Sequence, residues 1–502
     1  MKVLLIDAGS DREELNEPYG IESLAGNIEA IIKNVTVDLT WLLLDPINLE
    51  ILHEYDIIGI SAKLGSLPSV ELLLSNLQDK RKLRRVIIGG PLSTFGFQEL
   101  LKKYDDIICV RGEGETALIK LCELVNTNSS FDLHLKNIPN LAYIENGVII
   151  ENKRIYENLD ILAKPDRRFV KELCDKGGII RIENSRGCAY SRCSFCSVCE
   201  HYGYKGWRPF PIEFIINQLI ILSNFGCKSP YFTDEDFFGG DYERSRKLAL
   251  RIIEGKRKNV INKNMNFFFS ARINDILHEE GYETLRLWKK AGLREIFVGL
   301  ESGVKKQLQR YGKEASPDKN AQAIRIIKDL RLELDSGYIL FDPEMSFNEL
   351  VENVRYIESM NLSKNDSQSL KTVRAQPFTK LTNRYFANDI IIGELDVNLL
   401  FYPTRYKDEK IFNVLKAYTE WEIGSENDIY IMQANSRGEV LSESYRERLK
   451  TQLSKLRKID FFVLKTIVRN VNGIISEAKM KKVLSEKRIE KESLIKIYYD
   501  HR

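Results

Sequence analysis

Three closely spaced cysteines are the residues of this chain whose types and spacing are best suited to chemistry. Cys188, Cys193 and Cys196 have C-x4-C-x2-C spacing and follow a short apolar run, residues 179–182, that is typical of a buried strand. Three thiolates on one loop can hold three irons of a four-iron, four-sulfur (4Fe-4S) cluster and leave the fourth iron open to a substrate. The spacing therefore favours a cluster with one free coordination position.

A zinc site is the main alternative, because Cys199 extends the spacing to C-x4-C-x2-C-x2-C. Structural zinc sites usually divide four ligands between two separated pairs, so four cysteines within twelve residues are a less common arrangement. A disulfide fits a reducing compartment poorly. The cluster is favoured on spacing, the zinc site stays open, and Cys199 is interpreted as a packing residue.

Composition limits the classes of partner. The chain has 502 residues, enough for several domains, and its 75 lysines and arginines nearly balance its 72 aspartates and glutamates. Since the nearly balanced charges create no overall electrostatic field that would attract nucleic acid or a membrane, we expect local pockets to select the partner. No apolar run approaches the roughly 18 residues of a spanning helix, and residues 1–7 resemble a strand more than a signal peptide. We therefore expect a cytoplasmic protein.

In residues 1–125, short apolar runs alternate with amphipathic segments, which predicts a doubly wound, Rossmann-like α/β domain. Ligands of such sheets lie beyond the carboxyl ends of the strands. Glycines at those ends allow close approach of a large flat ligand, although ordinary strand-to-helix turns use the same residues. The candidate contacts there are Ser61, Gly65, Gly89, Gly90, Pro91, Gly112, Glu113 and Gly114.

Residues 126–176 are interpreted as a linker that contains a hairpin. A polar break at 126–130 suggests the boundary, and Asn146-Gly147 between two apolar runs, 141–144 and 148–150, is a strong hairpin signal. At the other end of the chain, residues 381–502 are mainly helical in pattern and are basic from residue 431 onward. We expect this C-terminal region to form a helical domain over the mouth of the preceding domain.

Residues 177–380 contain six short strands separated by helices, which predicts a partial (β/α)6 barrel with its site at the carboxyl ends of the strands. A ligand with an ammonium, a carboxylate and a ribose needs an acid, a base and short polar groups. Helix caps and solvated loops would use the same residue types. The polar residues expected at the strand ends are Asp234, Glu235, Asp236, Ser270, Arg272, Glu301 and Ser302.

The cysteine loop and three later motifs resemble the radical S-adenosylmethionine (SAM) domain. The motifs are Ser185-Arg186-Gly187-Cys188 with Cys193-Ser194-Phe195-Cys196, then 232–236, 299–303 and 339–343. The commonest cysteine spacing of that family is C-x3-C-x2-C, so this loop carries one extra residue. The resemblance implies a cluster on the three cysteines with Phe195 beside it, and reductive cleavage of SAM to a 5'-deoxyadenosyl radical that abstracts hydrogen from an unactivated C–H bond.

The resemblance also implies roles for the polar strand ends in binding SAM. The acidic cluster at 234–236 would bind the amino group of SAM, and Arg272, with Ser270 near it, would bind its carboxylate. Glu301 or Ser302 would bind the ribose. These assignments remain hypotheses at this stage.

Residues 1–125 resemble the cobalamin-binding domain found at the N-terminus of many radical SAM enzymes. The matching motifs are 17–20, 58–61, 87–91 and 110–115, and they add Tyr19 to the candidate cofactor contacts. The D-x-H-x-x-G loop that supplies a histidine to cobalt in other cobalamin proteins is absent. Because the only histidines before the cysteine loop are His53 and His134, the resemblance implies cobalamin without a histidine ligand on its lower face.

Together the two resemblances imply a cobalamin-dependent radical SAM C-methyltransferase. One SAM would methylate cobalt and a second would supply the radical, with a small metabolite or peptide as substrate and an external electron donor such as flavodoxin or ferredoxin. Cyclisation or rearrangement without net methylation is the alternative within the same class. A zinc-binding interaction protein is the alternative from a different class.

Overall fold

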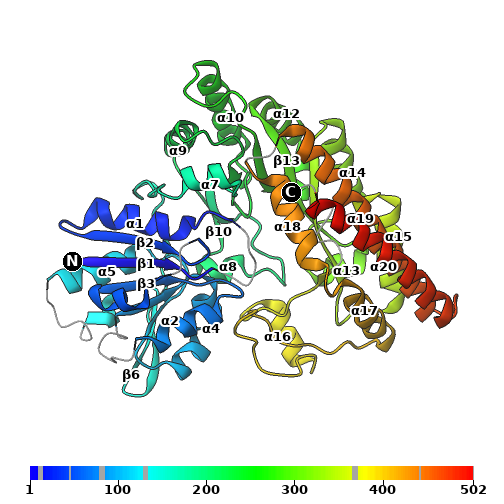
Figure 1. Ribbon diagram of the computed structural model, residues 1–502, viewed down its shortest axis with the longest axis horizontal. Coiled ribbons are helices and arrows are strands. Elements are labelled where there is room, and N and C mark those ends of the chain that lie inside the picture. Colours follow the sequence, from blue (N-terminus) through cyan, green and yellow to red (C-terminus); the bar gives the residue numbers. More distant parts are fainter. Residues whose placement is uncertain are drawn as a thin grey trace.

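The computed structural model describes residues 1–9, 15–44, 47–77, 85–127, 134–364, 371–439 and 442–500. Its first sheet has seven strands in the order β2-β1-β3-β4-β5-β6-β7. The first five strands are parallel and alternate with helices (Figure 1). Their bounds are β1 (Lys2–Asp7), α1 (Tyr19–Ile31), β2 (Thr36–Trp41), η1 (Leu49–Glu54), β3 (Ile57–Ser61), α2 (Leu67–Ser75), β4 (Val86–Gly89), α4 (Gly90–Lys103), β5 (Ile108–Val110) and α5 (Glu115–Asn126).

Strand β1, which lies between β2 and β3, shows why this sheet is covered on both faces. Val3 and Leu5 pack into one apolar cluster with residues of α1 and α5, whereas Leu4 and Ile6 pack into a second cluster with residues of α2 and α4. Successive side chains of a strand point to opposite faces, so an uninterrupted apolar run requires two covered faces. The predicted doubly wound domain is confirmed.

The predicted hairpin forms, but it is part of the first sheet. Strands β6 (Leu141–Glu145) and β7 (Val148–Glu151) add antiparallel to β5, and Asn146 and Gly147 both have positive φ in the turn between them. The first sheet therefore continues to Glu151, beyond the predicted boundary at 125. Residues 128–130 of the predicted polar break lie outside the described residues.

A second sheet of six parallel strands, in the order β15-β14-β13-β12-β11-β8, forms the predicted partial barrel. Helices connect most of these strands, so all their carboxyl ends lie at one edge. The 3-10 helix η2 (Leu135–Asn137) precedes the hairpin of the first sheet. The elements of the barrel region are α7 (Val170–Lys176), β8 (Arg181–Ile182), α9 (Ile212–Asn224), β11 (Tyr231–Phe232), α10 (Tyr242–Arg257), β12 (Phe267–Ala271), α11 (Ile273–Leu277), α12 (Gly281–Ala291), β13 (Leu293–Glu301), α13 (Lys305–Arg310), α14 (Pro317–Asp329), β14 (Glu333–Phe341), α15 (Phe347–Ser359), η3 (Leu362–Lys364) and β15 (Lys371–Thr372).

A small two-stranded sheet holds the cysteine loop. β9 (Ser185–Cys188) pairs antiparallel with β10 (Gly206–Pro209), and the short helix α8 (Val198–Tyr202) lies between them in the chain. Gly187 has φ of 88°, and a Cβ there would lie 2.3 Å from the carbonyl oxygen of Gly206. Glycine is therefore required directly before Cys188.

Residues 426–471 lie at the amino end of the barrel strands, whereas residues 380–387 lie on the mouth side, so the expected cover over the mouth is found only for the start of the C-terminal region. Arg437, the last residue of α18, forms ion pairs with Glu295 (2.5 Å) and Asp335 (2.6 Å), both near the starts of their strands. On the mouth side, the amide N–H of Leu381 donates to Ser194 O in the cysteine loop (2.7 Å). The helices are α16 (Lys380–Ala387), at the bottom centre of Figure 1, and, toward its right side, α17 (Glu409–Glu422), α18 (Glu426–Arg437), α19 (Glu443–Val471) and α20 (Glu477–Tyr499).

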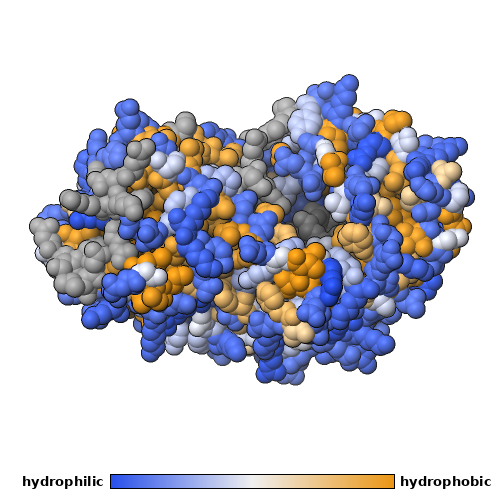
Figure 2. All heavy atoms as spheres, turned by 90° about the horizontal axis from the view of Figure 1, so that it is seen from below, coloured by the Kyte–Doolittle hydropathy of each residue, from blue (hydrophilic) through white to orange (hydrophobic). Residues whose placement is uncertain are grey.

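The surface seen from below is mostly hydrophilic, with apolar residues in small groups between charged ones (Figure 2). Among the described residues, no helix is both long and apolar enough to cross a membrane.

Candidate functional site

A cavity of about 380 Å³, here called the cysteine cavity, opens at the carboxyl ends of the barrel strands. The cysteine loop forms one wall and the strand ends form the other. Of the predicted site residues, the lining contains Cys188, Cys193, Phe195, Cys196, Asp234, Glu235, Ser270, Arg272 and Glu301.

The cysteines fit three-point attachment of a cluster. Cys188, Cys193 and Cys196 are free and face this one cavity, while Cys199 does not line it and its Sγ lies 3.8 Å from Ser191 O. A zinc ion would need its ligand atoms about 2.0–2.3 Å from one point. Within the described residues, no three His, Cys, Asp or Glu side chains are placed to hold a single metal ion. The geometry thus supports the cluster over a four-thiolate zinc site.

Burial keeps these thiols protonated in the protein alone. It raises the pKa of Cys188 to about 11 and that of Cys196 to about 12. Because only thiolates bind iron, loading the loop must release protons.

The two acids that line the cysteine cavity have different partners. Asp234 accepts hydrogen bonds from Asn184 N (3.1 Å), Asn184 Nδ2 (3.0 Å) and the hydroxyl of Ser185, so it holds the start of the cysteine loop. Glu235 accepts from Tyr202 Oη (3.0 Å) and Gly187 N (3.4 Å). Burial raises the pKa of Asp234 to about 8 and that of Glu235 to about 7. Glu235 is thus the acid with fewer structural contacts.

Arg272 is held by two carboxylates and keeps donors for a ligand. Its Nε lies 3.0 Å from Asp236 Oδ2, and its Nη2 donates to Asp275 Oδ1 (2.6 Å). No group in the described part of the chain accepts from its Nη1. Asp236 is fully buried, does not line the cavity, and also accepts from Ala189 N (3.0 Å). Asp236 therefore joins Arg272 to the cysteine loop.

Glu301 lines the cysteine cavity together with Lys313, a residue that the sequence did not suggest. Lys313 Nζ lies 2.9 Å from Glu301 Oε1, and a Cβ on Gly299 would lie 2.4 Å from the same oxygen. Burial would lower the pKa of Lys313, but Glu301 outweighs it and raises that pKa to about 12. Ser302 lies outside the cavity, where its hydroxyl bonds Gln307 and Asn353.

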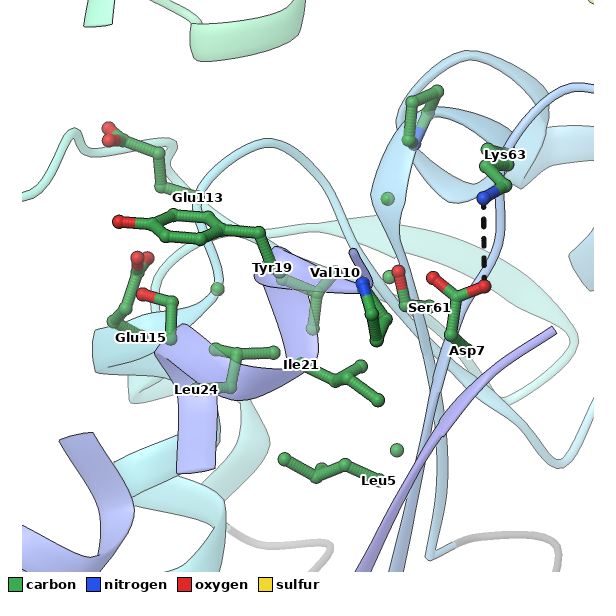
Figure 3. A pocket seen from close by; sticks show the side chains of 18 of the residues that line it. Leu5, Asp7, Tyr19, Ile21, Leu24, Ser61, Lys63, Val110, Glu113 and Glu115 are labelled. Carbon is green, nitrogen blue, oxygen red and sulfur yellow. Dashed lines mark ion pairs between the residues drawn. The ribbon is translucent and has the colours of Figure 1, made fainter. Parts of the chain in front are cut away.

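A second cavity of about 420 Å³, here called the sheet cavity, lies at the carboxyl ends of β1, β3, β4 and β5 (Figure 3). Figure 3 shows the hydroxyl end of Tyr19 directed toward Glu113 and Glu115, and Lys63 paired with Asp7 at 3.6 Å. The predicted residues that line it are Tyr19, Ser61, Gly89, Gly90, Pro91, Gly112, Glu113 and Gly114.

Gly65 is the one predicted contact of the first domain that does not line the sheet cavity. Its amide N–H donates to Asn398 O (2.9 Å), and Asn398 Oδ1 accepts from Leu67 N (3.1 Å). Gly65 thus docks the segment after α16 onto the first sheet. Gly89, by contrast, fits a ligand that approaches closely, since a Cβ built on it meets nothing within 4 Å.

The sheet cavity is closed on one side by residues around the cysteine loop. Thr233, directly after β11, lines both cavities, so the two cavities are neighbours at this residue. Most of these residues could not be predicted from the sequence, because they lie far along the chain from the first domain whose cavity they line. The residues contributed by the barrel side are Arg181, Glu183, Arg186, His201, Tyr202 and Thr233.

A buried ion network joins the two sides. Arg186, two residues before Cys188, pairs with Glu113 (2.7 Å) and Glu115 (2.8 Å), and Arg208 pairs with Glu113 (2.9 Å). Both carboxylate oxygens of Glu113 are therefore bound to arginines. His201 lies nearby, and burial lowers its pKa to about 4, so its imidazole is neutral.

Comparison with known proteins identifies a family for the second part of the chain. Residues 182–357 match the model of the radical SAM superfamily. The chain is 25% identical over 483 residues to 4'-phospho-dehydrooxetanocin synthase from Priestia megaterium, a match that covers 83% of this chain and 63% of that protein's length.

Solved structures show the same fold over nearly the whole chain. The cobalamin-dependent SAM radical enzyme OxsB, with aqua-cobalamin and SAM bound, superposes with a TM-score of 0.83 at 19% identity, covering 99% of this chain and 80% of that one. The radical SAM methyltransferase TsrM from Kitasatospora setae, with cobalamin and a [4Fe-4S] cluster bound, gives 0.65 at 15% identity, covering 79% and 76%.

Proposed function

Because this chain is a radical SAM enzyme with the fold of cobalamin-dependent members of that superfamily, we propose that it is a cobalamin-dependent C-methyltransferase. Its substrate is a small metabolite or peptide that reacts at an unactivated carbon. An external donor of the flavodoxin or ferredoxin type supplies electrons. The observation that carries the proposal is that the two cavities are neighbours, with Thr233 in the lining of both.

The residues divide between two cofactor sites. Cys188, Cys193 and Cys196 hold the cluster, while Glu235 receives the SAM ammonium and Arg272 its carboxylate. The glycine-rich turns after β4 and β5, with Tyr19, hold cobalamin. When bound, the cluster with SAM supplies a 5'-deoxyadenosyl radical and cobalamin supplies a transferable methyl group. A substrate carbon at the junction lies within reach of both.

Product analysis tests the methyltransferase directly. Anaerobic enzyme with SAM, reductant and a candidate substrate is expected to form methylated product, with S-adenosylhomocysteine and 5'-deoxyadenosine in equal amounts. Methylated product without 5'-deoxyadenosine would contradict the radical step.

A rearrangement without net methylation is the second candidate. The long match to a protein named as a synthase, not a methyltransferase, favours it. The same assay distinguishes the two reactions, since a rearrangement forms 5'-deoxyadenosine without stoichiometric S-adenosylhomocysteine.

Replacing Arg272 with alanine is expected to raise the KM for SAM about 10- to 100-fold, with a smaller change in kcat. A charged hydrogen bond contributes about 1.5–3 kcal/mol, and about 1.4 kcal/mol corresponds to a factor of ten. Steady-state kinetics on protein with verified iron content makes the measurement. An unchanged KM would remove Arg272 from the SAM site.

SAM binding is expected to strengthen as pH rises from 6 to 7.5. Glu235 has a pKa of about 7, and each pH unit below that value makes its carboxylate about tenfold rarer. The SAM dissociation constant at pH 6 should therefore be about tenfold higher than above pH 7. Glu235→Gln should lose this dependence, whereas Glu314→Gln, at an exposed position of the same cavity, should keep it. A flat profile in the wild type would exclude Glu235 as the ammonium's partner.

A further inference from the structure

The short helix α8 runs from one cavity to the other. It begins two residues after Cys196 with Val198, which lines the cysteine cavity, and ends with His201 and Tyr202, which line the sheet cavity. Residues four apart in a helix lie on the same face, so Val198 and Tyr202 belong to one continuous wall. A ligand that packs on either end therefore restrains the same five residues.

A hydrogen bond crosses between the two cavities at the end of α8. Tyr202 Oη donates to Glu235 Oε1 (3.0 Å), and Tyr202 belongs to the sheet cavity whereas Glu235 belongs to the cysteine cavity. The other oxygen of Glu235 accepts from Gly187 N, next to Cys188. Tyr202 is buried, so without this bond its hydroxyl would be a buried polar group with no partner there. The same bond orients the carboxylate of Glu235.

We propose that Tyr202 is a positioning residue that couples the two cofactor sites, so that a corrinoid in the sheet cavity strengthens SAM binding in the cysteine cavity. The inference rests on the proposed function. A corrinoid in contact with His201 and Tyr202 restrains α8 and, through the hydrogen bond, fixes Glu235 before SAM arrives. The protein then loses less conformational freedom when the second ligand binds, so that ligand binds more tightly. By linkage, each ligand strengthens binding of the other by the same factor.

Binding measurements on the full-length, cluster-reconstituted enzyme test this coupling. The SAM dissociation constant is measured with and without saturating hydroxocobalamin, and we expect binding to be tighter by about fivefold or more in its presence. Tyr202→Phe keeps the aromatic ring but removes the hydrogen bond to Glu235. The ratio of the SAM dissociation constants without and with hydroxocobalamin should therefore fall to about one. Tyr204→Phe is the matched control: it removes a tyrosine hydroxyl two residues away that lines neither cavity, and the wild-type ratio should be kept.

Hydrogen–deuterium exchange of the wild type gives a second readout that needs no variant. Hydroxocobalamin alone should slow exchange at residues 233–237, on the cysteine side of the bond. A wild-type ratio of one, a Tyr202→Phe ratio equal to that of the wild type, or unchanged exchange at 233–237 would each overturn the coupling. If the wild type binds no hydroxocobalamin, the proposed function fails as well, whereas binding of both ligands without coupling overturns this inference alone.

Discussion

Replacing any one of Cys188, Cys193 or Cys196 with alanine is expected to abolish SAM cleavage. In the proposed site each thiolate would hold one iron of the cluster, and the three cysteines are the only ones among the described residues that line this cavity. Anaerobically purified variants should lose most of their iron and sulfide, the electron paramagnetic resonance signal of the reduced cluster, and all 5'-deoxyadenosine formation.

Cys199→Ala is the matched control, since Cys199 lies on the same loop but outside the cysteine cavity. It should retain the cluster and SAM cleavage. Loss of the cluster in Cys199→Ala together with its retention in Cys188→Ala would reassign the first ligand. Zinc in place of iron in the wild type, dependent on all four cysteines, would contradict the cluster altogether.

Arg186→Ala is expected to lower the free energy of unfolding by about 3–5 kcal/mol, the usual result of removing one partner of a buried ion pair. The side chains of Arg186 and Glu113 are 7% and 2% exposed, and the variant leaves the buried Glu115 without its arginine and Glu113 with Arg208 alone. Cobalamin retention should fall too, because Glu113 and Glu115 line the sheet cavity. Urea unfolding of the apoprotein, followed by circular dichroism, gives the stability change.

Arg192→Ala is the control for the loss of an arginine from the same loop. Arg192 is 72% exposed and 3.4 Å from an exposed Glu314, so the change should cost only about 0–1 kcal/mol. Equal losses in the two variants would mean that the buried network does not hold the two cavities together.

Local sequence patterns predicted much of the architecture. The five-residue run at Ile57–Ser61, one of the short apolar runs of the first domain, forms the buried strand β3 and ends at a small polar residue. Ser316 caps α14 with its hydroxyl accepting from Lys319 N, and the Ser-Pro-Asp sequence at 316–318 is typical of such a helix start. These features depend on neighbours in the sequence, which explains why they could be predicted.

The errors come from long-range contacts. One long helix, α19, continues through Asp460, a buried acid that the sequence pattern alone would place at a break between two helices. Its carboxylate accepts hydrogen bonds from Trp421 Nε1 (2.7 Å) and Lys491 Nζ (2.6 Å). The basic C-terminal helices lie at the amino end of the barrel, since their charges pair with acids there. Both cases involve partners that are distant in the sequence.

In the candidate site, too, residues set by local sequence could be predicted and residues set by long-range contacts could not. The cysteines, Asp234, Glu235 and Arg272 follow recognisable strand ends and could be predicted. Lys313, Tyr202 and His201 could not, because each enters its cavity from a turn or helix without a motif.

Cobalamin retained by the purified protein tests the two-cofactor arrangement most directly. The cluster-reconstituted chain is incubated with hydroxocobalamin, separated from free ligand by gel filtration, and assayed by absorbance. About one cobalamin per chain is the stoichiometry that a single sheet cavity predicts. If protein with its full complement of iron retains no cobalamin, the two-cofactor arrangement is contradicted.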